Sequence, residues 1–251
     1  MSTLPIYVWV MVLVGVIGTT STICVMLWRG ALTAGVSRRT ATRVGAVAGI
    51  VWGAWVLASA VLAKADVYRF EPSKAAPWIA VAMIAPLAAV LASTRTPLVS
   101  RTLDQPDALW RLTVPQFFRP VGVTFLVAMA LGYLPALFAI PAGLGDIAIG
   151  VGAVSVAHNL RRGVAHRRTG WFNVLGLVDL IVALAIGVIA APGLARLLVV
   201  SPSTEAISLL PLVLIPTTIV PLAVALHVLS LRKLRAAAQT ETVAAPVGDT
   251  K

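Results

Sequence analysis

Long apolar runs separated by short polar connections dominate the pattern of this chain. A helix of about 20 apolar residues, rising 1.5 Å each, crosses a hydrocarbon core about 30 Å thick. We therefore expect seven transmembrane helices. They are predicted at residues 5–28, 44–63, 75–93, 121–140, 144–159, 171–191 and 206–231. The fifth is the shortest, and we expect a tight turn between the fourth and fifth at the stretch PAGLGD, residues 141–146.

The basic residues predict the orientation of these helices. Sixteen of the twenty lysines and arginines fall in the first, third and fifth connections or in the C-terminal tail. Basic residues in short connections are retained on the cytoplasmic side. The pattern therefore predicts an N-terminus outside and a cytoplasmic C-terminus. The third connection, residues 96–120, is expected to be either a short interfacial helix or an ordinary loop with aromatic anchors.

Composition supports the same class of protein. Hydrophobic residues make up 59% of the 251 positions and charged residues 12%, about half the charged share of a soluble domain. We predict an all-α integral membrane protein of the cell membrane, a seven-transmembrane helix bundle. The arginine-rich, Ala- and Val-rich usage indicates a bacterial source. Residues 236–251 lack apolar periodicity and are predicted to form a disordered cytoplasmic tail.

The net charge of +11 does not indicate nucleic-acid binding, because the basic residues are spread over short connections instead of one soluble face. We expect the partners to be the bilayer and the anionic lipid headgroups at its cytoplasmic face. Cys24 is the only cysteine, which excludes an intrachain disulfide and a metal site built on paired thiolates. No cofactor or metal is expected. The sequence gives no indication of the oligomeric state.

Asp179 is the main candidate for a functional residue. It lies near the middle of the sixth predicted helix, where an acid costs about 2.5 to 3.5 kcal/mol on insertion scales. No lysine or arginine is predicted at that depth in another helix. Two interpretations remain open: a functional carboxylate that faces water or a bound cation, and a protonated acid that only hydrogen-bonds between helices.

Asp146 is the second acid, at the predicted outer end of the fifth helix. After Gly143 and Gly145 it could cap the first turn, where free N–H groups and the helix dipole favour a negative charge. The alternative is a role in lining a cavity. The stretches GLGDI (143–147) and GLVDL (176–180) resemble each other, which would fit an inverted pair of helices.

The seventh predicted helix carries prolines at 211, 216 and 221, with Thr217 and Thr218 near its middle. Each proline frees a backbone carbonyl one turn earlier, and membrane helices tolerate such breaks where hydroxyls or neighbouring helices satisfy the carbonyls. We expect either oxygen ligands for a proton or small cation, or a kink that serves packing alone.

Three further residues are accessory candidates at the predicted cytoplasmic ends. His227 would be the inner step of a proton path or a solvated histidine, and Arg119 and Gln116 would contact headgroups or the path. Gly45, Gly49 and Gly53 recur every fourth residue. This small-residue face predicts close helix packing within the chain or, as an alternative, a dimer contact.

Two functions remain in play from the sequence. The first is a small proton- or cation-coupled carrier that uses the midplane carboxylate with Asp146, Thr217 and Thr218. The second is a non-catalytic membrane subunit or sensor whose basic face binds anionic lipid or a partner protein. An enzyme is less favoured, because one acid without a positioned partner is a poor catalytic set.

Overall fold

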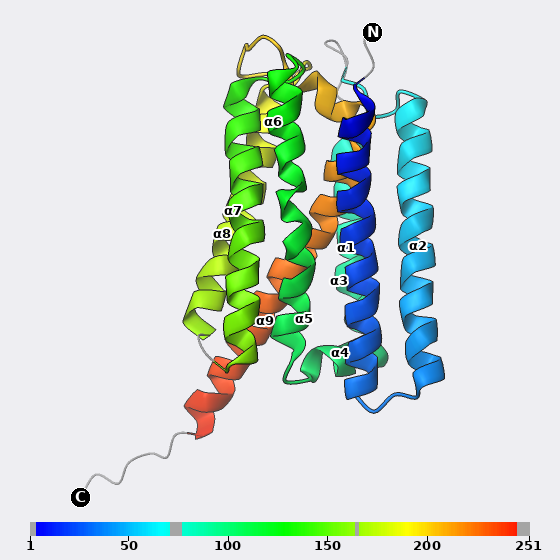
Figure 1. Cartoon of the computed structure of the whole chain (residues 1–251), viewed down its shortest axis with the longest axis vertical. Coiled ribbons are helices and arrows are strands. Elements are labelled where there is room, and N and C mark those ends of the chain that lie inside the picture. The colour runs from blue at the N-terminus through cyan, green and yellow to red at the C-terminus, as the bar shows by residue number, and fades with distance from the viewer. Residues whose placement is uncertain (1–3, 71–76, 164–165, 245–251) are drawn as a thin grey trace, which may run out of the picture.

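The chain folds as a bundle of helices (Figure 1). The computed structural model describes residues 4–70, 77–163 and 166–244, and these ranges contain no β-strand. The elements are α1 Ile6–Thr33, α2 Arg38–Lys64, α3 Trp78–Ser93, α4 Pro97–Asp104, α5 Ala108–Thr113, the 3₁₀ helix η1 Val114–Gly122, α6 Val123–Ala130, α7 Ala136–Arg161, α8 His166–Ile189, the 3₁₀ helix η2 Thr204–Ser208, the π-helix η3 Ile215–Ile219 and α9 Val220–Ala244.

Several of these helices are long and apolar enough to cross a membrane. Six qualify within the described part of the chain, counting α5–η1–α6 and η3–α9 as continuous segments. The pair α3 and α4 would make a seventh, although it bends by 79°. The all-helical, multi-pass character of the protein is thus supported, whereas seven crossings and their orientation stay predictions.

The fourth long helix begins earlier than expected. Its helical segment runs from Ala108 to Ala130, so the prediction of a connection at residues 96–120 is wrong from Ala108 onward. Arg111 and Arg119, which suggested a loop, are both buried. Only α4 (Pro97–Asp104) lies as a short helix across the end of the bundle (Figure 1).

The predicted turn at PAGLGD is also wrong, because these residues lie inside α7. The chain instead turns between α6 and α7, at residues 131–135, where Gly132 adopts a φ of +79°. Gly143 serves close packing: a Cβ there would lie 2.7 Å from Leu126 Cγ and 3.0 Å from the Gly122 carbonyl oxygen. The glycines therefore mark contact between helices instead of a break.

The C-terminal helix is longer than expected as well. α9 continues to Ala244, so the prediction of disorder is wrong for residues 236–244. The remaining predicted tail, residues 245–251, lies outside the described residues.

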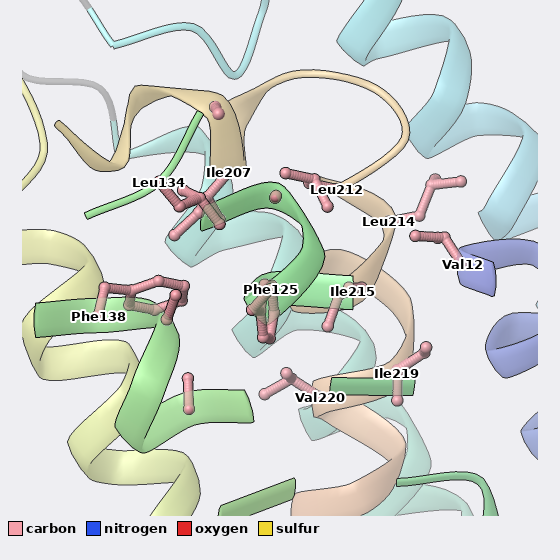
Figure 2. Close-up of a cluster of buried hydrophobic side chains, with 14 of the residues drawn as sticks. Val12, Phe125, Leu134, Phe138, Ile207, Leu212, Leu214, Ile215, Ile219 and Val220 are labelled. Carbon is pink, nitrogen blue, oxygen red and sulfur yellow. The ribbon is translucent and has the colours of Figure 1, made fainter. Parts of the chain in front are cut away.

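The main hydrophobic core joins the first half of α1 with α6, the start of α7 and the segment that leads into α9 (Figure 2). Phe125 of α6 and Phe138 of α7 meet edge to face with ring centroids 5.2 Å apart. Val12 of α1 lies opposite Leu214 and Ile215 in the same view. This core fixes the helices that carry the site described below.

Two of the three glycines of the small-residue face lie against α1. A Cβ at Gly45 would approach the Cys24 carbonyl oxygen to 3.2 Å, and one at Gly49 would approach Cys24 Sγ to 3.4 Å. A Cβ at Gly53 would meet nothing within 4 Å. Gly45 and Gly49 therefore pack α2 on α1, and Gly53 takes no part in that contact.

Candidate functional site

A buried arginine binds two carboxylates at the centre of the bundle. Arg119 lies in η1, and only 3% of its side chain is exposed. Its Nε donates to Asp146 Oδ1 of α7, and its Nη2 donates to Asp179 Oδ2 of α8 at 2.5 Å. Arg119, Asp146 and Asp179 are called the Arg119 cluster below. Three helical segments that are distant in sequence therefore meet at one guanidinium.

Two glycines make room for the carboxylates. A Cβ at Gly122 would collide with the side chain of Asp146, and a Cβ at Gly145 would collide with the carboxylate of Asp179. Each carboxylate therefore lies directly against the backbone of a neighbouring helical segment. Any larger residue at either glycine would displace the acid from Arg119.

The cluster lies deep between the helix ends. Arg119 is central in the segment Ala108–Ala130, about 18–19 Å from either end at 1.5 Å per α-helical and 2.0 Å per 3₁₀ residue. Asp179 is near the middle of α8. Charges at such depth in membrane proteins usually pair with one another and mark pathways or ligand sites. With both acids ionised the cluster carries a net charge of −1, so it has capacity for one added proton.

A cavity of about 80 Å³ adjoins the cluster and is otherwise walled by apolar residues. All three charged residues line it. Its other walls include Gly187 at the end of α8 and Ile207 of η2, so the cavity extends from the cluster toward the bundle end that holds η2. Pro216 and Ile219 of η3 line it as well.

A second buried polar group lies on the opposite side of the cluster. His227 of α9 is fully buried, and its Nδ1 lies 2.9 Å from Asn173 Oδ1 of α8. Gln116, three residues before Arg119, donates from Nε2 to the Ala223 carbonyl oxygen at 3.3 Å. The imidazole packs against Gly176, where a Cβ would collide with the ring. Polar side chains thus continue from the cluster toward the bundle end from which α9 projects.

Thr217 and Thr218 do not join the cluster. Both are fully buried in η3, but neither lines the cavity. Thr217 Oγ1 accepts from Ser59 Oγ at 2.7 Å, and its carbonyl oxygen accepts from Trp55 Nε1 at 2.9 Å. Thr218 Oγ1 donates to the Leu214 carbonyl oxygen. Thr217 therefore binds the broken helix to α2, and Thr218 satisfies a carbonyl within the segment itself.

Three sequence-based interpretations of these residues are wrong. Asp146 caps no helix, because it lies within α7 and is paired with Arg119. Asp179 is not remote from every cation, because Arg119 enters the bundle on η1. Neither Arg119 nor His227 is at the interface, since the side chains of both are buried. For Arg119 and Asp179 the physical reason is that the helix that begins at Ala108 carries Arg119 inward. For Asp146 it is that α7 begins ten residues earlier, at Ala136, and for His227 it is the contact with Asn173 of α8.

Sequence reasoning did not identify Asn173 or Gly122, and it gave Gly145 only a part in the predicted helix cap. Asn173 lies six residues before Asp179, and no spacing rule singles it out. The collision partners of Gly122 and Gly145 belong to other helices. The one available signal was the repeated G-L-x-D pattern, since its two acids are the ones that share Arg119.

Comparison with known proteins adds a family but no activity. Residues 76–235 match the family described as a domain of unknown function (DUF8737). The chain belongs to this family. The DUF8737 region contains the Arg119 cluster, Gln116, Asn173, His227 and both threonines, whereas α1 and α2 precede it. No curated protein and no solved structure matches the chain.

Proposed function

We propose that this DUF8737 protein is a small proton-coupled carrier in which the Arg119 cluster is the coupling site. The observation that carries the proposal is the sharing of one buried guanidinium by two carboxylates beside a cavity. Adding one proton to the cluster removes its net charge and weakens one ion pair. The same guanidinium then has a free donor pair for a solute.

Asp179 is the better candidate for the acid that takes up the proton. Its side chain is 14% exposed, against 11% for Asp146, and both line the cavity. On the side of the cluster away from the cavity lie the buried polar groups Gln116, Asn173 and His227. They supply hydrogen-bonding partners for a proton that moves from the cluster toward the end from which α9 projects. Protons are favoured over metal ions, because no group of three or more His, Cys, Asp or Glu occurs among the described residues.

Irregular helices on two sides of the cavity support the proposal. η1 carries Arg119 in nine residues of 3₁₀ helix, longer than the usual three or four, and η3 is a π-helix. Mid-helix 3₁₀ stretches and π-bulges often mark hinges and functional sites. A carrier needs such elements, because the site must open to each side in turn.

The substitution Asp179→Asn tests this function. It keeps the side-chain shape and leaves Arg119 paired with Asp146, so the variant should still fold. We expect wild-type protein in vesicles with an internal pH-sensitive dye to move protons with at least one class in a panel of small carboxylates, amino acids and sugars. Asp179→Asn should reduce that rate by about 10²-fold or more, the loss typical of removing a proton-transfer group.

Asp104→Asn is the matched control, because Asp104 is an exposed acid at the end of α4. It should transport at the wild-type rate. Proton movement that is the same in wild type and Asp179→Asn would contradict the proposal. So would a wild type that moves no protons with any member of the panel.

A non-catalytic subunit or sensor is the second candidate. It is favoured by the basic end of the bundle, where the guanidinium carbons of Arg29 and Arg161 lie 5.7 Å and 4.4 Å from the ring centroid of Trp110. Exposed cations held on a half-buried aromatic ring are well placed to meet an anionic surface. In that case the Arg119 cluster serves only to join helices, and Asp179→Asn lowers stability without any change in proton movement.

A further inference from the structure

A second and much larger cavity lies apart from the Arg119 cluster. It has a volume of about 770 Å³ and is walled by α1, α2, α3 and α9, with α4 and α5 at one end. Its lining shares no residue with the cavity at the cluster. The lining is almost entirely apolar, and its size is within the range of about 300–1,000 Å³ that holds small ligands.

The cavity opens between α2 and α3. Val47 and Val51 of α2 line it and are exposed, as are Ala85 and Ala89 of α3. α2 packs along α1, whereas its contact with α3 is slight. In a membrane this opening would face the hydrocarbon region, so an acyl chain could enter sideways from the bilayer.

Two arginines line the end of the cavity near α4. Arg43 is exposed near the start of α2. Arg111 of α5 is 5% exposed; its Nη2 donates to the Thr102 carbonyl oxygen at 2.5 Å and pairs with Asp107 at 3.0 Å. Arg111 Nε has no hydrogen-bond partner among the described residues. A buried donor of this kind is costly unless an acceptor reaches it.

Trp52 adds a second donor in the apolar part of the cavity. It is 9% exposed, lines the cavity, and its Nε1 finds no acceptor in the part of the chain that the structure describes. A buried tryptophan N–H usually has a hydrogen-bond partner, and the ester oxygens of a lipid would supply acceptors. The cavity therefore offers, in order from its basic end, two cations, a donor and an apolar interior.

We infer that this cavity binds an anionic phospholipid of the surrounding membrane. One acyl chain occupies the apolar interior between α2 and α3, and the phosphate lies at Arg43 and Arg111. Basic pockets between transmembrane helices commonly hold such headgroups, and the volume accommodates a chain that no protein side chain fills. An ordinary boundary lipid would satisfy the apolar wall alone, whereas the charge of Arg43 and the free Nε donor of Arg111 select for a negative headgroup.

Cys24 provides a direct reporter for this site. It is the only cysteine of the chain, it is half-buried, and it lines the cavity. Delipidated full-length protein in detergent is labelled with N-ethylmaleimide while phosphatidylglycerol or phosphatidylcholine with the same acyl chains is titrated in. We expect phosphatidylglycerol to halve the labelling rate at a concentration about fivefold lower than phosphatidylcholine, because one arginine near a headgroup favours the anion by about that factor and the charge of Arg111 is already offset by Asp107.

Three variants separate the contribution of the lipid's acyl chain to binding from that of its headgroup. Ala48→Phe fills the cavity wall and should remove protection by both lipids, measured against its own labelling rate in detergent. Ala46→Phe is the matched control, because Ala46 lies on the same helix, is exposed and does not line the cavity. Arg43→Gln should bring the two half-protection concentrations together. Native mass spectrometry should show one retained phosphatidylglycerol in wild type and Ala46→Phe.

Three results would overturn the inference. Equal protection by both lipids in wild type would show ordinary boundary lipid. Protection by glycerol 1-phosphate without an acyl chain would show a free phosphate site. Unchanged protection in Ala48→Phe would place the lipid elsewhere. None of these measurements depends on proton movement, so the lipid site and the carrier function stand or fall separately.

Discussion

Arg119 contacts carboxylates from two different helices, and the surrounding glycines allow both acids to reach it. Such a buried arrangement does not by itself stabilise the fold, because bringing the charges out of water offsets their attraction. Its effect on stability depends on which residue is removed. Removing the arginine leaves two uncompensated acids, while removing one acid leaves a neutral pair.

The glycine at 145 gives a test at this scale. Gly145→Ala should displace the Asp179 carboxylate and lower the free energy of unfolding by about 1–3 kcal/mol, the usual range for overpacking. Gly53→Ala is the control, because its Cβ would meet nothing within 4 Å. It should be neutral or stabilising by about 1 kcal/mol, since alanine favours helix over glycine. Denaturant titration in detergent, followed by circular dichroism, compares them; equal losses would contradict the packing described.

The acids could be found from the sequence because a charge in an apolar run is conspicuous. Arg119 could not be placed inside the bundle from the sequence, because an arginine in a short stretch between two apolar runs is ordinarily evidence for a cytoplasmic connection. The same residue thus placed the predicted start of its own helix too late, at residue 121 instead of Ala108. His227 was misplaced for a related reason: its partner Asn173 lies on another helix, and no local pattern connects them.

Among the elements, η3 shows how a broken helix is accommodated. Its backbone is tied to α2 through Trp55, and its Thr217 hydroxyl accepts from Ser59. Side-chain hydroxyls and neighbouring helices are the means by which membrane helices tolerate such breaks. The prolines at 211, 216 and 221 made the irregularity predictable, but the direction in which the threonines point was not.

A double-mutant cycle on this contact tests the element scale. Ser59→Ala and Thr217→Val should each destabilise the protein, and their coupling energy should be about 0.6 kcal/mol, the average for hydrogen bonds between membrane helices. Thr218→Val combined with Ser59→Ala is the control, since Thr218 bonds only within its own segment among the contacts observed. In this control pair the effects of the two substitutions on stability should be additive. A coupling energy indistinguishable from zero for Ser59 and Thr217 would contradict the predicted strength.

The helix boundaries show which physical signals are weak in the sequence. The long helices could be located from the lengths of the apolar runs, because the thickness of the hydrocarbon core sets the length of a membrane-crossing helix. PAGLGD was read as a turn since proline and glycine usually punctuate helices. In α7 its glycines instead permit contact with Leu126 and with the Asp179 carboxylate, and that need arises only once the helices are assembled.

At the scale of the whole molecule, the bundle has two distinct ends. Figure 1 places α4, the α1–α2 connection, the end of α7 and the start of α8 at the end from which α9 projects. The α6–α7 turn lies at the opposite end. If the basic connections are cytoplasmic, the small cavity at the Arg119 cluster extends toward the outside and the large cavity lies in the cytoplasmic half.

Single-cysteine labelling tests this orientation. In a Cys24→Ser background, Leu131→Cys should react with a membrane-impermeant maleimide from outside intact cells, because residue 131 is in the α6–α7 turn. Arg162→Cys, after the end of α7, should react only in inverted vesicles. Labelling of residue 162 from the outside would contradict the orientation.

The central claim is that Arg119 lies inside the bundle and neutralises Asp146 and Asp179 together. The most direct test measures the stability of Arg119→Gln beside the triple variant Arg119→Gln, Asp146→Asn, Asp179→Asn. The single variant should lose about 3–5 kcal/mol of unfolding free energy, because it leaves buried charges unpaired, and the triple variant should regain most of that loss. A single variant within about 1 kcal/mol of wild type, or a triple variant less stable than the single one, would contradict the account.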